Sequence, residues 1–360
     1  MPMLEWRVRS AGFAGSIAQL ISVVGEAAWR HASPRDRLPP LSEMPMFIRG
    51  LHEGLHGMNA PSDFVRPDLS ESGPLAIFSD FSDRSGVWRT YSFLCCPKAA
   101  AEAMCEKLGK LRKNLAMEDG RRLEYKSLRD QKRWEALPTW LDAFDDLPGV
   151  AFVLLVHQDV LSAFKANAAG ERDELLKMTS ELGLGDWSKT KSGAQILEEA
   201  WRIVHCVAYL HGALNGGRSP LHWYCDNDEI HAGALRRAAV DRMLPMVVEK
   251  YSRRQTDSCL ITEEQLGRDP LRDLFSIPDL LCACVLELQS GADSGATDML
   301  GKAAVVGEWL GSSRALQKVA LRITAQDDGG VWWELHRPYF QIDRERLAAM
   351  LGNPDGPPTG

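Results

Sequence analysis

The sequence predicts an α/β protein in which a mixed β-sheet is covered by helices. Short, continuous apolar runs at 75–78 (LAIF) and 150–156 (VAFVLLV) are typical of central strands that are buried on both faces. The segment 87–96 is a further strand candidate, and only a short turn separates it from 75–78. This spacing favours an antiparallel hairpin. Helical patterns then alternate with further strand candidates, which indicates a mixed sheet with helices packed on it.

The start of the chain is predicted to be a helical N-terminal arm. Its apolar segment 12–29 contains Gln19 and Glu26 and is barely long enough to span a membrane, so we expect a soluble amphipathic helix and no membrane contact. Pro- and Ser-rich stretches at 32–45 and 59–74 separate this arm from the rest of the chain. We divide the chain into an arm (1–74), a core (75–290), a C-terminal α/β extension (291–352) and a flexible tail (353–360).

The elements of the core are predicted from local patterns. Pro97 opens a helix on which Met104, Leu108, Leu111 and Leu115 share one face. Further helices are expected at 194–214, at 234–251 with a kink or break at Pro245, from Pro278 to about Leu288, and near 297–311. Further strands are expected at 122–128, 150–156, 221–225, 258–262 and 331–335, and the segment 316–324 fits either a strand or a helix.

Composition and charge are those of an ordinary globular protein. Charged residues make up 25%, apolar residues 45%, and the formal net charge is -7, so any contact with nucleic acid requires a local basic patch. The segment 107–133 offers one, since it holds ten Lys and Arg against four Asp and Glu, a net charge of +6. It either brings a phosphate backbone towards Glu124 or is a solvated basic face.

The cysteines indicate a reducing compartment. None of the eight forms a C-x-x-C pair, and Cys282 and Cys284 lie in an apolar run that is typical of a core. This pattern is that of buried thiols in a cytoplasmic protein and not of a disulfide framework or a zinc site.

Four acidic residues take similar places in the predicted fold. Asp80 ends the first central strand, Glu124 lies on a strand, Asp226 ends a later strand, and Asp279 lies in the first turn of a helix. Side chains at strand ends and helix starts can meet at one edge of a sheet, where the repulsion between carboxylates requires a cation. Ligands that are all oxygen suit Mg²⁺ or Mn²⁺. Each acid alone also fits a turn, a helix start or a surface ion pair.

Four strings, IFSDFSDRSG, LEYKSL, HWYCDNDE and IPDLLCACV, resemble in this order the motifs of the Domain of Unknown Function 3800 family, over about 75–289. The resemblance implies a ribonuclease-H-like fold and a metal-dependent nuclease that acts on DNA or RNA, often in phage defence or mobile elements. Departures are Phe81 and Asp83, where the family has Glu and Gly, and Pro278, where it has Ala.

The resemblance also implies which residues form the site. The metal ligands would be Asp80, Glu124, Asp226 and Asp279, with Lys126 as a further catalytic residue and Asp83 and Asp228 as substitutes for a ligand. Lys126 stands two residues after Glu124, hence on one face of a strand, where it would offset negative charge or meet a phosphate. A surface ion pair is the simpler interpretation of Glu124 and Lys126.

A rival motif lies in the arm. His52, Glu53 and His56 match H-E-x-x-H, which on a helix would bind zinc in a metalloprotease. Gly54 weakens a helix here, and Pro61 closes it. We therefore predict a Mg²⁺- or Mn²⁺-dependent nuclease, with a non-catalytic module that binds nucleic acid or a protein partner as the main alternative, and a zinc protease as a lesser one.

Overall fold

The computed structural model describes most of the predicted core. The described ranges are 38–56, 66–82, 86–117, 120–160, 171–183, 193–226, 230–252, 255–294, 301–325 and 331–336. Outside them lie the amphipathic helix expected at 12–29, the tail, and Asp83 and Asp228, the two acids expected as substitutes for a metal ligand.

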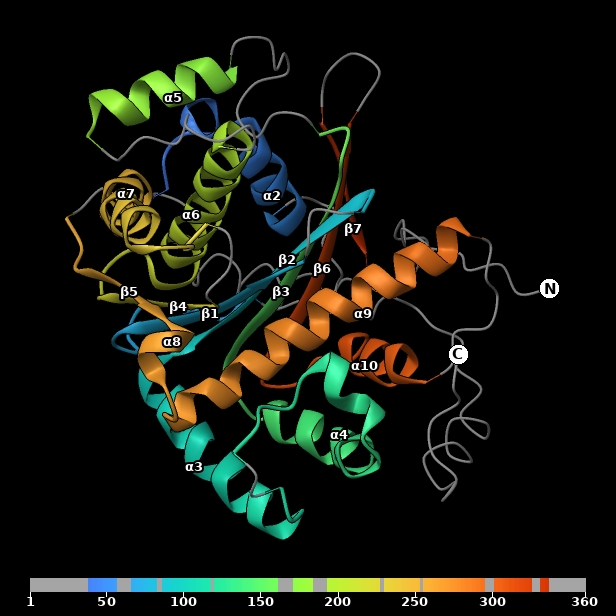
Figure 1. Ribbon diagram of the computed structural model, residues 1–360. Coiled ribbons are helices and arrows are strands. Elements are labelled where there is room, and N and C mark those ends of the chain that lie inside the picture. Colours follow the sequence, from blue (N-terminus) through green and yellow to red (C-terminus); the bar gives the residue numbers. More distant parts are fainter. Residues whose placement is uncertain are drawn as a thin grey trace, which may run out of the picture.

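The strands of the described ranges form one mixed sheet of seven strands, in the order β5-β4-β1-β2-β3-β6-β7 (Figure 1). Strands β1, β2 and β3 are successively antiparallel, whereas β4 and β5 add to β1 in parallel; β6 is parallel to β3 and antiparallel to β7. Their bounds are β1 Leu75–Phe81, β2 Trp88–Pro97, β3 Gly149–His157, β4 Leu221–Cys225, β5 Ser258–Thr262, β6 Leu316–Ala325 and β7 Val331–His336.

Helices cover both faces of this sheet, so the fold is α/β with three layers (Figure 1). On one face lie α2 (Met46–His56), α6 (Gly193–Asn215) and α7 (Ala234–Ser252), with α5 (Glu171–Glu181) packed on α6. On the other lie α3 (Lys98–Asn114), α4 (Gln131–Phe144), α9 (Ser276–Asp293) and α10 (Lys302–Leu310). Short elements complete the chain: η1 (Leu41–Glu43), η2 (Tyr125–Arg129), α8 (Glu263–Leu266) and η3 (Pro270–Phe275).

Alternation along β1 assigns its residues to the two faces. Leu75 and Ile77 pack with α6, whereas Ala76 and Phe78 pack with α3 and α9. Because side chains alternate with period two, Asp80 belongs to the α3–α9 face. This places the first predicted site residue under α9, which contacts β1, β2 and β3.

Most predicted elements are confirmed, with specific corrections. The strand expected at 122–128 is wrong, because the segment forms the 3₁₀ helix η2. Helix α7 runs through Pro245 without a break, and 316–324 is a strand. Helix α9 begins at Ser276, two residues before the expected start.

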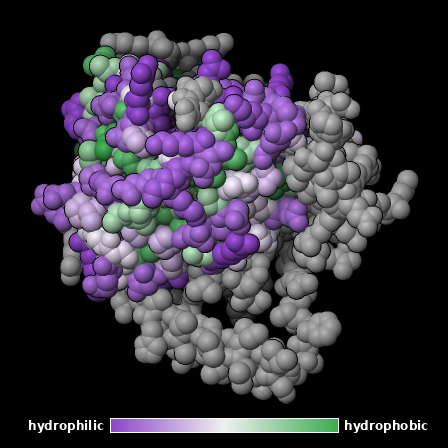
Figure 2. Space-filling model, turned by 90° about the horizontal axis from the view of Figure 1, so that it is seen from below, coloured by the Kyte–Doolittle hydropathy of each residue, from purple (hydrophilic) through white to green (hydrophobic). Residues whose placement is uncertain are grey.

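The outer surface and the helices bear on membrane contact. In Figure 2, which views the molecule from the side of α3 and α4, hydrophilic residues cover most of the coloured surface and hydrophobic ones form small patches. Among the described helices, none is both long and apolar enough to cross a bilayer.

All eight cysteines are free thiols, and all but Cys259 are buried.

Candidate functional site

Three acids stand side by side where three parallel strands end. The register pairs Ser79 of β1 with Cys225 of β4, and Cys225 with Thr262 of β5. The next residues along these strands are Asp80, Asp226 and Glu263. Parallel strands bring their carboxyl ends to one sheet edge, so this register gathers three carboxylates there.

Two further acids reach the same edge from the helical layer. Glu124 precedes η2, and Asp279 lies in the first turn of α9. The backbone N–H of Tyr125 donates to the Asp279 carboxylate at 2.6 Å, which joins the two segments. The thiol of Cys282 donates to the backbone carbonyl of Asp80 at 3.1 Å and thereby fixes α9 over the end of β1. We call Asp80, Glu124, Asp226, Glu263 and Asp279 the acid cluster.

The prediction that Glu124 lies on a strand is wrong. Its side chain and that of Ser127 form reciprocal capping bonds around the start of η2, and these close a tight turn. Lys126 lies in that turn with its ammonium group 3.1 Å from the Glu124 carboxylate, and its side chain is 83% exposed. Lys126 is therefore an ion-pair partner at the rim, facing solvent, and is not on a strand face.

Arg122 lies in the middle of the acid cluster with its side chain only 7% exposed. Its guanidinium is 2.8 Å from Glu263, 3.3 Å from Glu124 and 3.5 Å from Asp226. Burial alone would lower the pKa of Arg122, but the surrounding carboxylates, Glu263 foremost, outweigh it and raise that pKa. Arg122 is thus a permanent cation that compensates several acids at once.

The remaining repulsion acts on the acids themselves. Burial, together with the negative charges of Asp279 and Asp226, raises the pKa of Asp80 to about 8. Burial also raises the pKa of Asp279, although the hydrogen bond from Tyr125 N–H opposes this shift. Burial raises the pKa of Glu263 as well, although the charge of Arg122 opposes it. Groups with such shifted pKa values, gathered at the end of a sheet, are typical of functional sites.

The side chains of the cluster can be compared with the ligands that a divalent metal ion requires. The donors are all oxygens, as Mg²⁺ and Mn²⁺ prefer. Yet within the described ranges no three His, Cys, Asp or Glu side chains are placed to hold an ion. The guanidinium of Arg122 contacts the carboxylates that an ion would need. The cluster therefore fits a divalent cation in chemistry, but the carboxylates of Glu124, Asp226 and Glu263 are directed at Arg122.

Arg122 and Glu263 are the residues that sequence reasoning missed. Glu263 could have been found, since it comes directly after a predicted strand, as Asp80 and Asp226 do. Arg122 had only a weak signal, its place two residues before Glu124 within a basic segment.

The basic segment 107–133 is largely engaged in internal contacts. At least six of its ten cations contact a side chain or carbonyl of the protein: Lys107, Arg112, Arg122, Lys126, Lys132 and Arg133. The segment therefore contributes fewer charges to an external ligand than its net charge of +6 implies.

The H-E-x-x-H motif lies on helix α2, although glycine was expected to weaken a helix there. The His52 ring contacts the Tyr209 hydroxyl at 3.1 Å, on the face of the sheet away from the acid cluster. The side chains of Glu53 and His56 lie outside the described residues.

We expect His52 to be structural. The purified protein should then carry no stoichiometric zinc by elemental analysis, and His52→Ala should leave any nuclease activity unchanged. One tightly held zinc per chain that disappears in His52→Ala would instead establish a zinc site.

No protein-family model matches the chain, and searches of curated proteins and of solved structures found no similar protein. The likeness to the Domain of Unknown Function 3800 family consequently rests on the four short motifs.

Proposed function

We propose that the protein is a Mg²⁺- or Mn²⁺-dependent nuclease that cleaves phosphodiester bonds of DNA or RNA. The observation that carries the proposal is the meeting of acids from separate segments: Asp80, Asp226 and Glu263 follow three neighbouring parallel strands, and Glu124 and Asp279 reach them from the helical layer. Burial, together with the charges of Asp279 and Asp226, raises the pKa of Asp80 to about 8. Their chain order and identity are those of the motifs that resemble a suspected nuclease family.

The sheet supports a ribonuclease-H-like core within this proposal. Three antiparallel strands, β1 to β3, are followed by two strands that add in parallel beside β1. This order, with an acid on the first strand and another after the fourth, agrees with the fold that the motif resemblance implies.

Each residue would have a defined part in this site. Asp80, Glu124, Asp226 and Asp279 would hold the metal, which in such sites activates water and stabilises a leaving oxygen. The N–H of Phe81 donates to Asp80 at 2.9 Å and that of Tyr125 to Asp279, so both carboxylates are oriented by backbone. Lys126, exposed at the rim, would meet a substrate phosphate.

Arg122 favours a second candidate function. An internal cation already balances the acids, so the cluster can be stable without metal. A ribonuclease-H-like module that binds nucleic acid or a protein without cleaving would need no more than this. Metal dependence separates the two candidates.

The deciding assay incubates the purified protein with Mn²⁺ and single- or double-stranded DNA or RNA. We expect cleavage that EDTA abolishes and that falls roughly 100-fold or more in Asp80→Asn and in Asp279→Asn. Asp241→Asn, an exposed acid on α7, is the matched control and should cleave like the wild type. Equal cleavage by all four proteins would refute the site, and its absence with every substrate would favour the binding module.

A further inference from the structure

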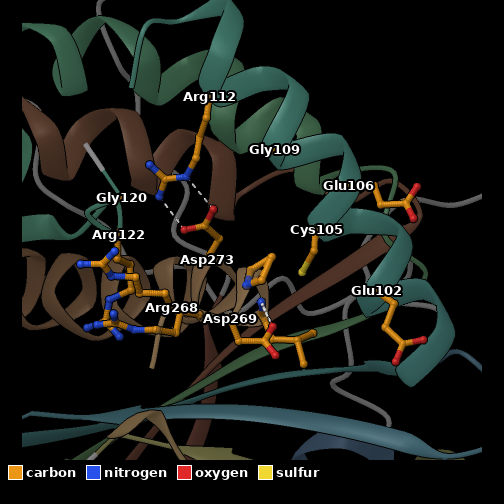
Figure 3. A pocket seen from close by; sticks show the side chains of 13 residues that line it. Glu102, Cys105, Glu106, Gly109, Arg112, Gly120, Arg122, Arg268, Asp269 and Asp273 are labelled. Carbon is orange, nitrogen blue, oxygen red and sulfur yellow. Dashed lines mark hydrogen bonds and ion pairs between the residues drawn. The ribbon is translucent and has the colours of Figure 1, made fainter. Parts of the chain in front are cut away.

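A pocket of about 590 Å³ lies between α3 and η3, next to the acid cluster (Figure 3). Arg122 belongs to both, since it lines the pocket and also contacts Glu124, Asp226 and Glu263. The volume falls in the range of small-molecule sites, roughly 300–1,000 Å³. A volume of this size suits one nucleotide, which has to be unpaired to enter it.

The charges of the pocket are separated between its two ends. In Figure 3, Arg112, Arg122 and Arg268 lie at the end near Gly120, together with Asp273, which pairs with Arg112; Glu102 and Glu106 lie along α3 at the other end. Because Arg112 and Arg122 are already paired with carboxylates, Arg268 is the arginine at this end whose charge can attract an anionic group.

The arginines differ in how fully their donors are used. Arg112 forms a two-bond pair with Asp273 and donates to two backbone carbonyls, and Arg272 donates to Glu263 at 2.8 Å and to a carbonyl. These contacts make a fixed wall. Arg268, in contrast, is exposed, and among the described residues it has no ion pair or hydrogen bond. Its planar guanidinium suits a phosphate, which it can bind with two N–H groups.

We propose that this pocket receives one nucleotide of a single nucleic-acid strand, with its phosphate on Arg268. The inference rests on the proposed function for the cleavage step, and it names the substrate class: a single strand. Because Arg122 separates the pocket from the acid cluster, the bound nucleotide would lie next to the bond that is cleaved.

The test measures binding without cleavage. The full-length protein is titrated in EDTA against a fluorescent single-stranded oligonucleotide and its duplex, at several salt concentrations, by anisotropy. We expect Arg268→Ala to weaken single-strand binding about threefold to tenfold. Losing one phosphate contact should also lower the slope of log K against log salt by about 0.7. Arg268→Lys should keep that slope.

The matched control is Arg242→Ala, which removes the same charge from α7 on the other face of the sheet, where Arg242 contacts backbone carbonyls. It should bind like the wild type. Equal binding by Arg268→Ala and Arg242→Ala, absence of single-strand binding, or a duplex bound as tightly as the single strand would overturn the inference.

These outcomes are separable from those of the cleavage assay. If the protein cleaves with Mn²⁺ but its single-strand binding does not depend on Arg268, the proposed function stands and this inference fails. Arg268-dependent binding in a protein that never cleaves retains the inference and loses the nuclease.

Discussion

Replacement of Arg122 by methionine should lower the free energy of unfolding by about 3–5 kcal/mol in EDTA at neutral pH. Methionine keeps most of the volume but removes the charge that Glu124, Asp226 and Glu263 share. Glu263 then keeps Arg272 and Glu124 keeps Lys126 as cationic partners, so the desolvation of these acids is less fully offset than with Arg122 present. Chemical denaturation followed by circular dichroism measures the loss.

The control for this variant is Arg314→Met. Arg314 is 62% exposed and pairs with the exposed Asp142; it also lies 3.6 Å from the buried Asp145, which Lys318 neutralises as well, so its replacement should cost about 1 kcal/mol or less. A similar small effect of Arg122→Met would show that Arg122 does not compensate the acid cluster.

Mn²⁺ then separates a metal site from a purely structural ion network. If the carboxylates bind the ion once Arg122 is removed, an excess of about a hundredfold over Kd restores about 2.7 kcal/mol to Arg122→Met. The wild type should gain less, because its arginine competes for the same carboxylates. An unfolding free energy of Arg122→Met that is insensitive to Mn²⁺ would exclude a metal from this cluster.

The sheet was predictable because burial leaves a simple pattern. Strands buried on both faces have continuous apolar runs, and 75–78 and 150–156 stand out for that reason. The antiparallel turn between β1 and β2 was predictable from the few residues that separate them. The placing of Asp80 and Asp226 at neighbouring strand ends then required only that β1 and β4 be parallel.

Glu124 shows where the pattern failed. Leu123 and Tyr125 flank Glu124 as apolar residues flank a polar one on a strand, yet the segment turns. The decisive interaction is local: Ser127 accepts from the N–H of Glu124 and donates to its carbonyl, at 3.0 and 2.6 Å. This Glu-x-x-Ser order reverses the usual Ser/Thr-x-x-Glu/Gln capping signature, so the sequence offered no ordinary start signal for the turn.

Arg122 and Glu263 show a different limit. Their partners are distant in the chain, since Arg122 contacts Asp226 and Glu263 across more than a hundred residues. Which cation enters a group of acids depends on tertiary packing, and sequence spacing gives only a weak signal of it. The sequence therefore predicted four of the five acids of the cluster, but neither Glu263 nor the cation that neutralises them.

Two histidines of α6 should make the fold labile to acid. His205 contacts the Tyr251 hydroxyl at 2.8 Å, and the His211 ring contacts the Ser219 carbonyl at 2.9 Å. Burial, with a smaller effect of Lys250, lowers the pKa of His205 to about 3, and burial lowers that of His211 to about 4 despite its hydrogen bond. Both rings are neutral in the folded protein well below their unfolded pKa of about 6.5.

Proton binding sets the sign of this effect. Below about pH 6.5 the two histidines bind protons in the unfolded chain but stay neutral in the folded chain. The free energy of unfolding therefore falls as the pH is lowered towards the pKa values of the folded state. Between pH 7 and pH 5 each histidine should remove about 2 kcal/mol. Asp80, whose pKa is raised, acts in the opposite direction over this interval, so the wild-type change alone does not isolate the histidines.

Variants isolate them. The free energy of unfolding at pH 5 minus that at pH 7 should be about 2 kcal/mol higher in His205→Gln, and likewise in His211→Gln, than in the wild type. Urea titration at both pH values measures it. Tyr251→Phe removes the hydroxyl beside His205 but leaves the titrating ring, and it should keep the wild-type pH dependence while lowering stability at both values. A pH dependence in His205→Gln and His211→Gln equal to that of the wild type would show that neither buried ring resists protonation.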